Sequence, residues 1–486
     1  MDESVTVYPA PPGEVLSDDW SVSVNGVAVP VYRVRVSAVP LNQRWPGYQR
    51  PLDQTELAGA AWWDMSGPVD VEVVSRRAVE GVVVRPRSRG IAPEVTGDRI
   101  AFTMAEPGPV TVEVNGAHHA LHLFGNPPED TRPNSDDPSV LYFPPGVHDA
   151  GRIDLTSGQT VYIAGGAVVY GAIEARNASG VRILGRGVLD TSRCRRTHKS
   201  YQTAGPTEEP FGCIALSDCD DVTISGVVLR DPSVYTITPT ACRGVRISDV
   251  RIVGSWRYNT DGIHFYNSED CTVERCFVRS FDDSIVVNGL PVHRGCACGH
   301  LPMRNVTVRD CVIWNDWGRA LRVGVANSAP EVTDITFRNC DVIHAADVVI
   351  GMEHGGRAAV SDIRFEAIRV ELDDDAPKPV YQSRRDEVFV PNTDFRHRLC
   401  TIIVEESIYS RDPERGSISD VAFRDIRVSG GETPRSVIAG YDADHRVENV
   451  TFEDLVINGA PVTDAAAGAF TIGDHVRNVR FTASAP

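Results

Sequence analysis

The sequence predicts an all-β protein, with an N-terminal antiparallel β-sandwich followed by a right-handed parallel β-helix. Two patterns indicate this order. Residues 1–125 alternate short valine-rich runs with turn residues, whereas residues 139–486 repeat one short apolar unit many times. Between them, residues 126–138 are rich in Pro, Asn and Asp, a composition typical of an interdomain linker. We therefore expect three segments: a sandwich, a linker and a β-helix domain.

The sandwich is indicated by strands of period two that end in turn signals. The run Val110–Gly116 alternates valine with polar residues and closes in Asn-Gly, and Ser21–Gly26 does the same. Alternation followed by Asn-Gly is the strongest short-range signal for a β-hairpin. Several such runs in the first 125 residues favour two packed antiparallel sheets.

The β-helix is indicated by a recurring unit with apolar residues at alternate positions. It appears at Val222–Leu229 and Val245–Ile252, and further copies follow to the end of the chain. Most copies begin roughly 23–34 residues apart, a period typical of solenoids. Cys276, Cys311 and Cys340 fall on inward positions of their units, so we expect buried thiols there.

Composition excludes some classes of partner. The chain has 486 residues, with 48 Lys and Arg against 66 Asp and Glu, and a formal net charge of −18. Nucleic acids and anionic membrane surfaces require a basic face, so neither is an expected partner. No apolar run approaches the roughly 18–20 residues that span a bilayer. Composition and charge specify no oligomeric state.

Two features of the sequence bear on where in the cell the protein acts: its N-terminus and its cysteines. Met1–Val5 is acidic and lacks the apolar stretch of a secretory signal. The 11 cysteines are odd in number and begin only at Cys194, unlike an extracellular disulfide framework. We expect a cytoplasmic protein; the alternative is secretion with a leader that this sequence does not include.

Three aspartates form the candidate catalytic cluster. Asp261 lies in Asn-Thr-Asp-Gly, and Asp282 and Asp283 follow about one rung later. Neighbouring rungs lie roughly 4.8 Å apart, so the three carboxylates should meet on one face of the β-helix. Carboxylates this close cannot all ionise freely, and this separates a general acid from a general base. Ordinary turn aspartates are the alternative, since Asp220-Asp221 shows that this chain also makes acidic turns.

The motif Thr260-Asp261-Gly262, followed by Asp282-Asp283, resembles the active-site pattern of the inverting β-helix glycoside hydrolases. These are the polygalacturonase family (family 28) and the dextranase/isopullulanase family (family 49), and the latter also carries an N-terminal sandwich. The resemblance implies that Asp282 or Asp283 protonates the leaving oxygen. The remaining aspartates, Asp261 included, would activate water, without metal or cofactor. A one-rung gap is closer to the roughly 5 Å spacing of retaining enzymes, yet the resemblance implies inversion.

Departures from the polygalacturonase pattern bear on the substrate. Those enzymes carry an Arg-x-Lys pair that grips the substrate carboxylate, whereas Gly318–Gly324 contains no lysine, and their Gly-His-Gly is only echoed by Gly299-His300-Leu301. A protein with a net charge of −18 also attracts a polyanion poorly. We therefore expect a neutral glucan of the dextran or isomalto type. Pectin remains the alternative, because Arg294, Arg304, Arg319 and Arg322 would make a cleft locally positive.

Substrate contacts are expected mainly from aromatic and basic residues near the aspartates, because the C–H faces of sugars stack on rings. Strand alternation lets one of two nearby arginines point outward, and Arg322 is the one expected to touch substrate. The full predicted set is Asn259, His264, His300, Arg319, Arg322, Trp256, Tyr258, Trp317, Trp62 and Trp63.

The sandwich carries an aromatic stretch of its own. Arg44–Arg50 contains Trp45 and Tyr48, and Trp62 and Trp63 follow it. Such a long, weakly periodic loop is often functional and would close one end of the cleft. A role in the domain interface is an equal alternative for these residues, and the sandwich as a whole could instead only cap the first rung of the β-helix.

A compact His293-x-x-Cys296-x-Cys298-x-His300 cluster offers four potential zinc ligands. Structural zinc sites usually separate two ligand pairs by a longer loop, so we expect no metal here. The segment is predicted to form a loop over the aspartates, with His300 touching substrate.

Two other functions remain open. In a polysaccharide lyase, the aspartates would hold calcium and Arg319 would abstract the proton. In a non-catalytic glycan-binding solenoid, the sugar would bind without turnover. A calcium requirement with an unsaturated product would identify the first, and binding without hydrolysis the second.

Overall fold

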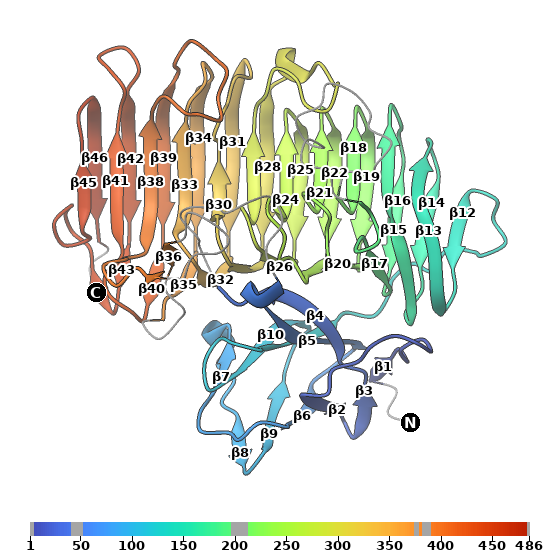
Figure 1. Ribbon diagram of the computed structural model, residues 1–486. Helices are drawn as coiled ribbons and strands as arrows, with labels where there is room; N and C mark the ends of the chain where they lie inside the picture. The colour runs from blue at the N-terminus through green and yellow to red at the C-terminus, as the bar shows by residue number, and fades with distance from the viewer. Residues whose placement is uncertain (1–3, 40–51, 196–211, 374–378, 382–389, 484–486) are drawn as a thin grey trace.

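The computed structural model describes residues 4–39, 52–195, 212–373, 379–381 and 390–483. Within these ranges nearly all regular structure is β-strand, and the three 3₁₀ helices, Leu52–Gln54, Arg87–Arg89 and Cys298–His300, are one turn each. None of the helices in this part of the chain is long and apolar enough to cross a bilayer. The predicted order, a β-sandwich followed by a parallel β-helix, is confirmed (Figure 1).

The sandwich consists of two sheets. The first has the order β3 (Val27–Val29), β2 (Trp20–Val24), β6 (Val69–Ser75), β9 (Arg99–Met104) and β8 (Glu94–Thr96), and it is antiparallel throughout. The second has the order β1 (Val5–Val7), β5 (Thr55–Met65), β11 (Leu121–Asn126), β10 (Gly108–Val114) and β7 (Val82–Arg85), with β4 (Tyr32–Ser37) also on β5. The antiparallel prediction is wrong for one pair, since β5 and β11 run parallel.

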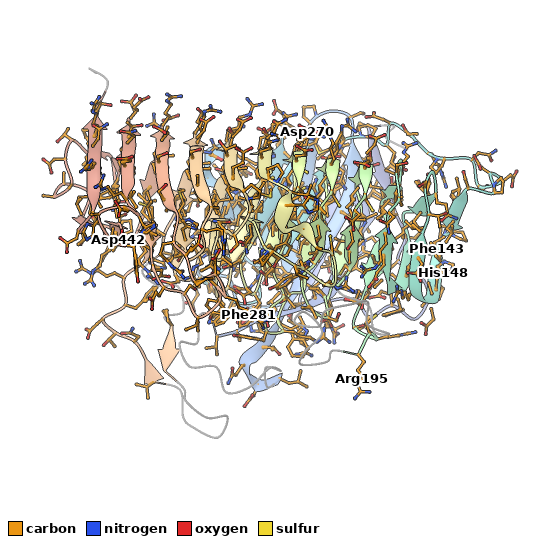
Figure 2. The ribbon with its side chains drawn as sticks, turned by 90° about the horizontal axis from the view of Figure 1, so that it is seen from above. Phe143, His148, Arg195, Asp270, Phe281 and Asp442 are labelled. Carbon is orange, nitrogen blue, oxygen red and sulfur yellow. The ribbon has the colours of Figure 1, made fainter. Side chains whose placement is uncertain are left out.

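The β-helix is built on three rows of strands. The outer row is a 12-stranded parallel sheet of β12 (Val140–Phe143), β14 (Thr160–Ile163), β16 (Arg182–Gly185), β19 (Asp220–Ser225), β22 (Arg243–Ser248), β25 (Glu269–Glu274), β28 (Met303–Arg309), β31 (Glu331–Arg338), β34 (Ala359–Glu366), β39 (Ser417–Arg424), β42 (Val447–Glu453) and β46 (Val476–Thr482). Figure 2 views this stack from above, with Phe143 and His148 at its N-terminal end and Asp442 toward the other end.

The other two rows belong to one 21-stranded sheet. The long strands β13 (Gly146–Leu155) and β15 (Ala167–Arg176) begin it and contribute to both rows. The docked row contains β17 (Val188–Asp190), β20 (Val228–Arg230), β23 (Arg251–Val253), β26 (Phe277–Ser280), β29 (Val312–Asn315), β32 (Asp341–Ala345), β35 (Arg369–Glu371), β40 (Arg427–Ser429) and β43 (Val456–Ile457), with β44 (Ala460–Pro461) antiparallel to β43. The open row contains β18 (Ile214–Ser217), β21 (Ile237–Thr240), β24 (Ile263–Tyr266), β27 (Ile285–Asn288), β30 (Arg319–Val323), β33 (Val348–His354), β38 (Arg398–Val404), β41 (Arg435–Ala439) and β45 (Phe470–Ile472). A separate hairpin pairs β36 (Val380–Tyr381) with β37 (Val390–Pro391).

The interior of the β-helix is one continuous apolar core, to which every rung contributes the side chains of alternate residues. Phe337, Phe365 and Phe423 stack in successive rungs with ring centroids 5.1 and 5.0 Å apart. The predicted core thiols are confirmed, because Cys276, Cys311 and Cys340 are buried in this core. The cysteines form no disulfides in the described structure, and all but Cys194 are buried.

The sandwich lies along the side of the β-helix, beneath the middle rungs in Figure 1, and does not cover its end. Val34, Trp62 and Phe124 of the sandwich share a buried cluster with docked-row residues from Val188 to Ile343. The suggestion that the sandwich caps the first rung is therefore wrong. Flank docking buries apolar side chains of several rungs at once, which the small end face of one rung could not do.

Buried ion pairs tie the two domains together. Arg186 Nε donates to Asp64 Oδ1 at 2.8 Å. Arg85 bridges both domains, since its Nε lies 3.0 Å from Glu113 of the sandwich and its Nη1 lies 2.6 Å from Glu371 of β35. These charges leave water together with their partners, so they fix the orientation of the sandwich.

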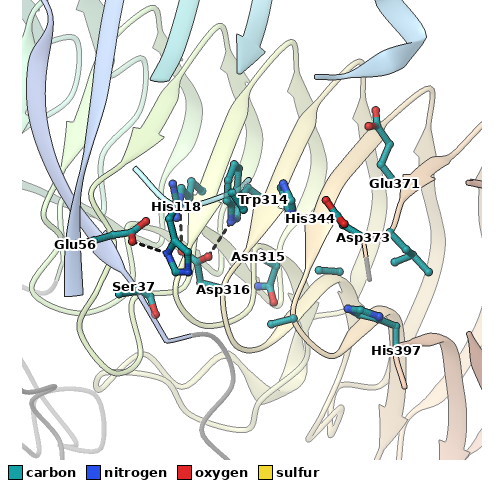
Figure 3. A pocket seen from close by; sticks show the side chains of 16 residues that line it. Ser37, Glu56, His118, Trp314, Asn315, Asp316, His344, Glu371, Asp373 and His397 are labelled. Carbon is teal, nitrogen blue, oxygen red and sulfur yellow. Dashed lines mark hydrogen bonds and ion pairs between the residues drawn. The ribbon is translucent and has the colours of Figure 1, made fainter. Parts of the chain in front are cut away.

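A small cavity of about 50 Å³ remains in this interface (Figure 3). His118 Nδ1 contacts Glu56 Oε2 at 2.6 Å on the sandwich side. On the β-helix side, Trp314 Nε1 donates to Asp316 Oδ1 at 2.7 Å. The volume of this cavity is far below that of a ligand-binding pocket, so we assign it to the packing of the domain interface.

Candidate active site

A cleft with a volume of about 1020 Å³ runs over the open row. Its described lining comes entirely from the β-helix domain: Tyr235, Tyr258, Asn259, Asp261, His264, Tyr266, Asp282, Asp283, Asn288, Leu290, Pro291, Val292, His293, Arg294, Gly299, Trp317, Arg319, Arg322, Gly324, Val325, Ala326, Ser328, Arg357, Ile408, Tyr409, Arg411, Asp412 and Pro413. This volume is at the upper end of the roughly 300–1,000 Å³ of small-molecule sites, so the cleft is large enough for an extended ligand.

The structure brings the three predicted carboxylates together. Asp261 precedes β24, and Asp282 and Asp283 form the turn between β26 and β27. The register of β24 on β27 pairs Ile263 with Ile285, which places Asp261 beside Asp283 on adjacent rungs. Gly262 N also donates to Asp283 O at 2.9 Å. The expectation that one rung separates the pair from Asp261 is confirmed.

Asp283 is held as an anion by two arginines. Its Oδ1 accepts a hydrogen bond from Arg319 N at 2.8 Å, and its Oδ2 accepts one from the Arg322 guanidinium. Burial by itself would raise the pKa of this carboxyl, but Arg322 and Arg319 together hold the pKa below its ordinary value. Asp283 is therefore ionised at neutral pH.

Asp282 has the opposite preference. Burial, followed by the neighbouring charges of Asp261 and Asp283, raises its pKa well above the ordinary value. Its Oδ1 accepts a hydrogen bond from Asp283 N at 2.9 Å, which fixes the side chain in the turn. Two adjacent carboxyls with opposed preferences form a coupled pair in which one proton resides on Asp282.

The turn that carries the pair is braced from the next rung. Asn315 Nδ2 donates to Asp282 O at 2.7 Å and to Ser284 Oγ at 3.1 Å. Ser280 Oγ also donates to Asp282 O at 2.7 Å. Sequence reasoning missed both residues: Ser280 is a close neighbour of Asp282 in the chain, whereas Asn315 reaches this turn only through the register of β26 on β29.

His264 contacts Asp261 and lies between two tyrosines. Its Nδ1 is 2.9 Å from Asp261 Oδ2, and its ring stacks on Tyr235 and Tyr266 with centroids 5.0 and 4.3 Å away. Burial lowers the pKa of His264 to about 3, so the imidazole is neutral. A neutral ring that donates through Nδ1–H to a carboxyl oxygen presents Nε2 as an acceptor. Nε2 meets no hydrogen-bond partner among the described protein atoms.

The arginine prediction is correct in part. Arg322 lines the cleft as expected, but Arg319 lines it as well. Strict alternation fails because two consecutive residues, Ala320 and Leu321, both enter the core. Sequence reasoning missed Glu353 of β33, whose Oε1 lies 2.9 Å from Arg319 and whose Oε2 lies 3.5 Å from Arg322.

Some of the predicted aromatic and polar contacts lie in the cleft. Tyr258, Asn259 and Trp317 line it, and the rings of Tyr258 and Trp317 are 5.0 Å apart. Trp256 does not line it, because the ring is buried and its Nε1 donates to Asp231 Oδ1 at 2.9 Å. The expected contact between Trp256 and substrate is therefore not supported.

The two sandwich tryptophans also lie elsewhere. Trp62 is buried in the domain interface, stacked on Tyr32 at 4.3 Å, and donates from Nε1 to Arg186 O at 2.9 Å. Trp63 is fully buried in the sandwich core. The placement of Trp62 and Trp63 at the cleft is therefore wrong, since β5 is covered on both faces. The aromatic loop Arg44–Arg50 lies outside the described residues.

The histidine–cysteine segment forms one end of the cleft. His293 lines the cleft, with Nδ1 2.8 Å from Thr240 Oγ1 and its ring 4.0 Å from that of Tyr266. His300, the expected contact, does not line it, because its Nδ1 turns back to Ala297 O at 3.1 Å. In the chain as described, no three His, Cys, Asp or Glu side chains converge in a way that would hold a metal ion.

Comparison with known proteins bears on the origin of this site. Residues 153–382, which include all three aspartates, match the sequence profile described as glycosyl hydrolases family 28. Over these residues the chain is similar to the β-helix glycoside hydrolases. The resemblance drawn from the Asp261 and Asp282-Asp283 motif is thereby confirmed.

Two curated relatives of this β-helix hydrolase type are dextranases. The chain is 24% identical over 255 residues to the dextranase of Arthrobacter sp. (strain CB-8), a match covering 48% of this chain and 36% of that protein. It is 22% identical over 321 residues to the dextranase of Arthrobacter globiformis, covering 61% of this chain and 46% of that protein. The matches thus span less than half the length of these relatives.

Solved structures of this type share the whole architecture. Dex49A from Penicillium minioluteum aligns with a TM-score of 0.65 at 18% identity, covering 98% of this chain and 96% of that chain. The family 28 exopolygalacturonase of Yersinia enterocolitica aligns with a TM-score of 0.53 at 12% identity, covering 84% of this chain and 96% of that chain. At these identities the likeness establishes the fold.

Proposed function

We propose that this protein is an inverting glycoside hydrolase that cleaves α-glycosidic bonds of a neutral glucan of the dextran or isomalto type. The observation that carries the proposal is the coupled pair of Asp282 and Asp283 in a large cleft. One carboxyl is kept protonated by burial and like charge, and the other is kept ionised by Arg322. General acid catalysis at a glycosidic oxygen needs such a proton donor next to a fixed anion.

The roles follow from these protonation states. Asp282 donates its proton to the glycosidic oxygen as the bond to the anomeric carbon breaks. A water molecule attacks the same carbon from the opposite face and transfers a proton to the ionised Asp283, with Asp261 as its second hydrogen-bond acceptor. The positive charge that develops on the sugar ring is stabilised by the same carboxylates.

Inversion is favoured over retention by the contacts of Asp283. Both of its oxygens already accept hydrogen bonds, from Arg319 N and from the Arg322 guanidinium. A carboxylate engaged in this way is a poor nucleophile for a covalent sugar intermediate, but it still accepts a hydrogen bond from water. Direct attack by water then gives the inverted anomer.

A neutral substrate is favoured by the charges of the cleft. Of the five arginines in its described lining, four are paired with protein carboxylates, and Arg411 is the fifth. The pairs are Arg294 with Glu174, Arg319 with Glu353, Arg322 with Asp283, and Arg357 with Asp412. Arg304 pairs with Glu269 on the outer row, away from the cleft. A polyanionic chain would have to compete for these partners, whereas hydroxyl groups would not.

Hydrolysis of pectin is the second candidate, because the matching sequence profile is that of family 28. One experiment separates the two candidates. The protein is incubated with dextran, pullulan, polygalacturonate and short α-linked oligosaccharides, and new reducing ends are measured. We expect release from dextran or isomalto-oligosaccharides, and proton NMR should show the β-anomer first. Release from polygalacturonate alone would refute the neutral substrate, and an α-anomer as first product would refute inversion.

The same assay tests the other classes. A lyase would need calcium and form an unsaturated product that absorbs ultraviolet light, so activity that survives a chelator contradicts it. A glycan-binding solenoid would release no reducing ends. We also propose that the protein acts in the cytoplasm, which the buried thiols favour; secretion remains the alternative.

A further inference from the structure

One wall of the cleft, beyond Arg319 and Arg322 along the open row, is formed by residues 408, 409 and 411–413 and carries exposed apolar side chains. Ile408 and Tyr409 line the cleft, yet their exposed fractions are 93% and 66%. These are the highest exposed fractions among the large apolar residues of the described structure. An exposed aromatic ring in the wall of a cleft is typical of a site that binds a ligand.

The wall is firmly anchored. Asp412 accepts hydrogen bonds from the backbone N, Nε and Nη2 of Arg357 at 3.1, 2.8 and 2.8 Å. The guanidinium of Arg415 donates to the carbonyl oxygens of Gly355 and Asp412. A Cβ at Gly355 would lie only 2.7 Å from Ser407 Cβ, so the glycine lets the wall pack directly on the end of β33. Tyr409 is thus presented on a fixed support.

The wall lies on the line of the cleft, away from the aspartates. It follows β38, which is three rungs beyond β27 by way of β30 and β33. With about 4.8 Å per rung, β38 lies about 14 Å from β27 along the axis. A glycan chain cleaved at Asp282 and lying along the open row would therefore bring a sugar unit away from the scissile bond to this wall.

We propose that Tyr409, together with Ile408, forms a distal subsite that binds a neutral sugar unit of the same chain that is cleaved at Asp282. This inference rests on the proposed function and adds to it a preference for longer chains. The apolar C–H face of a pyranose packs on the exposed phenol ring, and Ile408 extends the apolar surface. A glycan too short to reach this wall would gain no binding energy from it.

The test compares chain lengths. kcat/KM is measured on isomalto-oligosaccharides of two to eight units with the wild-type protein, Tyr409→Ala and Tyr409→Phe. For Tyr409→Ala we expect an unchanged value on the shortest substrates and a loss of about 5- to 20-fold on the longest. Tyr409→Phe keeps the ring and should stay close to wild type at every length. Val147→Ala is the control, since Val147 is a large apolar residue that is 44% exposed and lies outside the cleft lining.

Two results would overturn the subsite: equal losses at all lengths, or no loss on the longest chain. A binding measurement separates this failure from failure of the proposed function. Isomalto-oligosaccharides are titrated calorimetrically into Asp282→Asn and into the double variant Asp282→Asn/Tyr409→Ala. If the wild-type protein hydrolyses no chain, but long chains bind more weakly to the double variant than to Asp282→Asn, the subsite stands and the proposed hydrolysis fails. If no chain binds to either, both proposals fail.

Discussion

Gly318 packs directly against Asp283: a Cβ added at position 318 would lie 2.5 Å from Asp283 Oδ1 and 2.6 Å from its backbone nitrogen. The same Cβ would lie 2.8 Å from Asp282 Oδ1. No side chain fits there unless the turn of the two aspartates moves. The glycine at this position is thus part of the geometry of the acid–base pair.

We expect Gly318→Ala to lower kcat/KM by about 10²-fold, because a displacement of about 1 Å in a catalytic group has this effect. The measurement is the initial rate on the substrate found in the screen. Gly81→Ala is the control, since a Cβ at Gly81 meets nothing within 4 Å. Unchanged kinetics in Gly318→Ala would show that the turn does not hold the catalytic geometry.

Asp282→Asn removes the proton donor at nearly constant shape. We expect kcat on a natural glucan to fall by roughly 10²–10⁴-fold. An aryl glycoside with a good leaving group needs little protonation, so its hydrolysis should fall much less. Asp270→Asn, in the half-buried start of β25 on the outer row and outside the cleft lining, serves as the control. Equal losses on both substrates would argue against Asp282 as the acid.

The two aspartates should affect stability in opposite ways. The pKa of Asp282 is raised in the folded state, so its favourable contribution is present in acid and is lost as the pH rises above the ordinary value of 3.8. Asp282→Asn should therefore raise Tm, and by more at pH 8 than at pH 4. The pKa of Asp283 is lowered, so its contribution is present above 3.8 and is lost as the pH falls. Asp283→Asn should lower Tm at neutral pH and have less effect in acid. Calorimetric scans from pH 3 to 8 test both signs, and shifts of the same sign would contradict the assigned protonation states.

His264 is expected to position Asp261 through Nδ1. An Asn side chain places its amide nitrogen near the position of His264 Nδ1, whereas a Gln side chain places its amide nitrogen near the position of Nε2. We therefore expect His264→Asn to retain kcat within about 10-fold and His264→Gln to lose about 10²-fold. The reverse order of the two variants would assign the important contact to Nε2 and the substrate.

Much of the fold and of the carboxylate cluster could be predicted because both depend on local periodicity. The spacing of Asp261 from Asp282 and Asp283 equals one rung, and stacking of rungs then brings them together. Tyr258 and Asn259 lie on the same turn as Asp261, so proximity in sequence sufficed to place them in the cleft. Trp317 lies on the equivalent turn one rung after Asp282 and Asp283, between β29 and β30.

Other contacts depend on features that local periodicity does not contain. Both Arg319 and Arg322 face the cleft because the core takes two consecutive residues, Ala320 and Leu321, which breaks the alternation. Glu353 comes from a later rung, so its pairing with Arg319 requires the register of β30 on β33. Trp62 and Trp63 are aromatic residues of a strand that is buried on both faces, and composition alone does not distinguish such a strand from an exposed loop.

The flank position of the sandwich bears on where the molecule opens. A solenoid whose rungs contact only their neighbours frays readily from its ends. The sandwich acts as a splint across this stack, from Val168 of β15 to Glu371 of β35, through apolar contacts and the Arg85 bridge. The rungs that carry the three aspartates lie within the splinted part. Backbone amides of β24, β27 and β30 should accordingly exchange with solvent deuterium last, and those of β41 and β45, which lie beyond the splint, should exchange first.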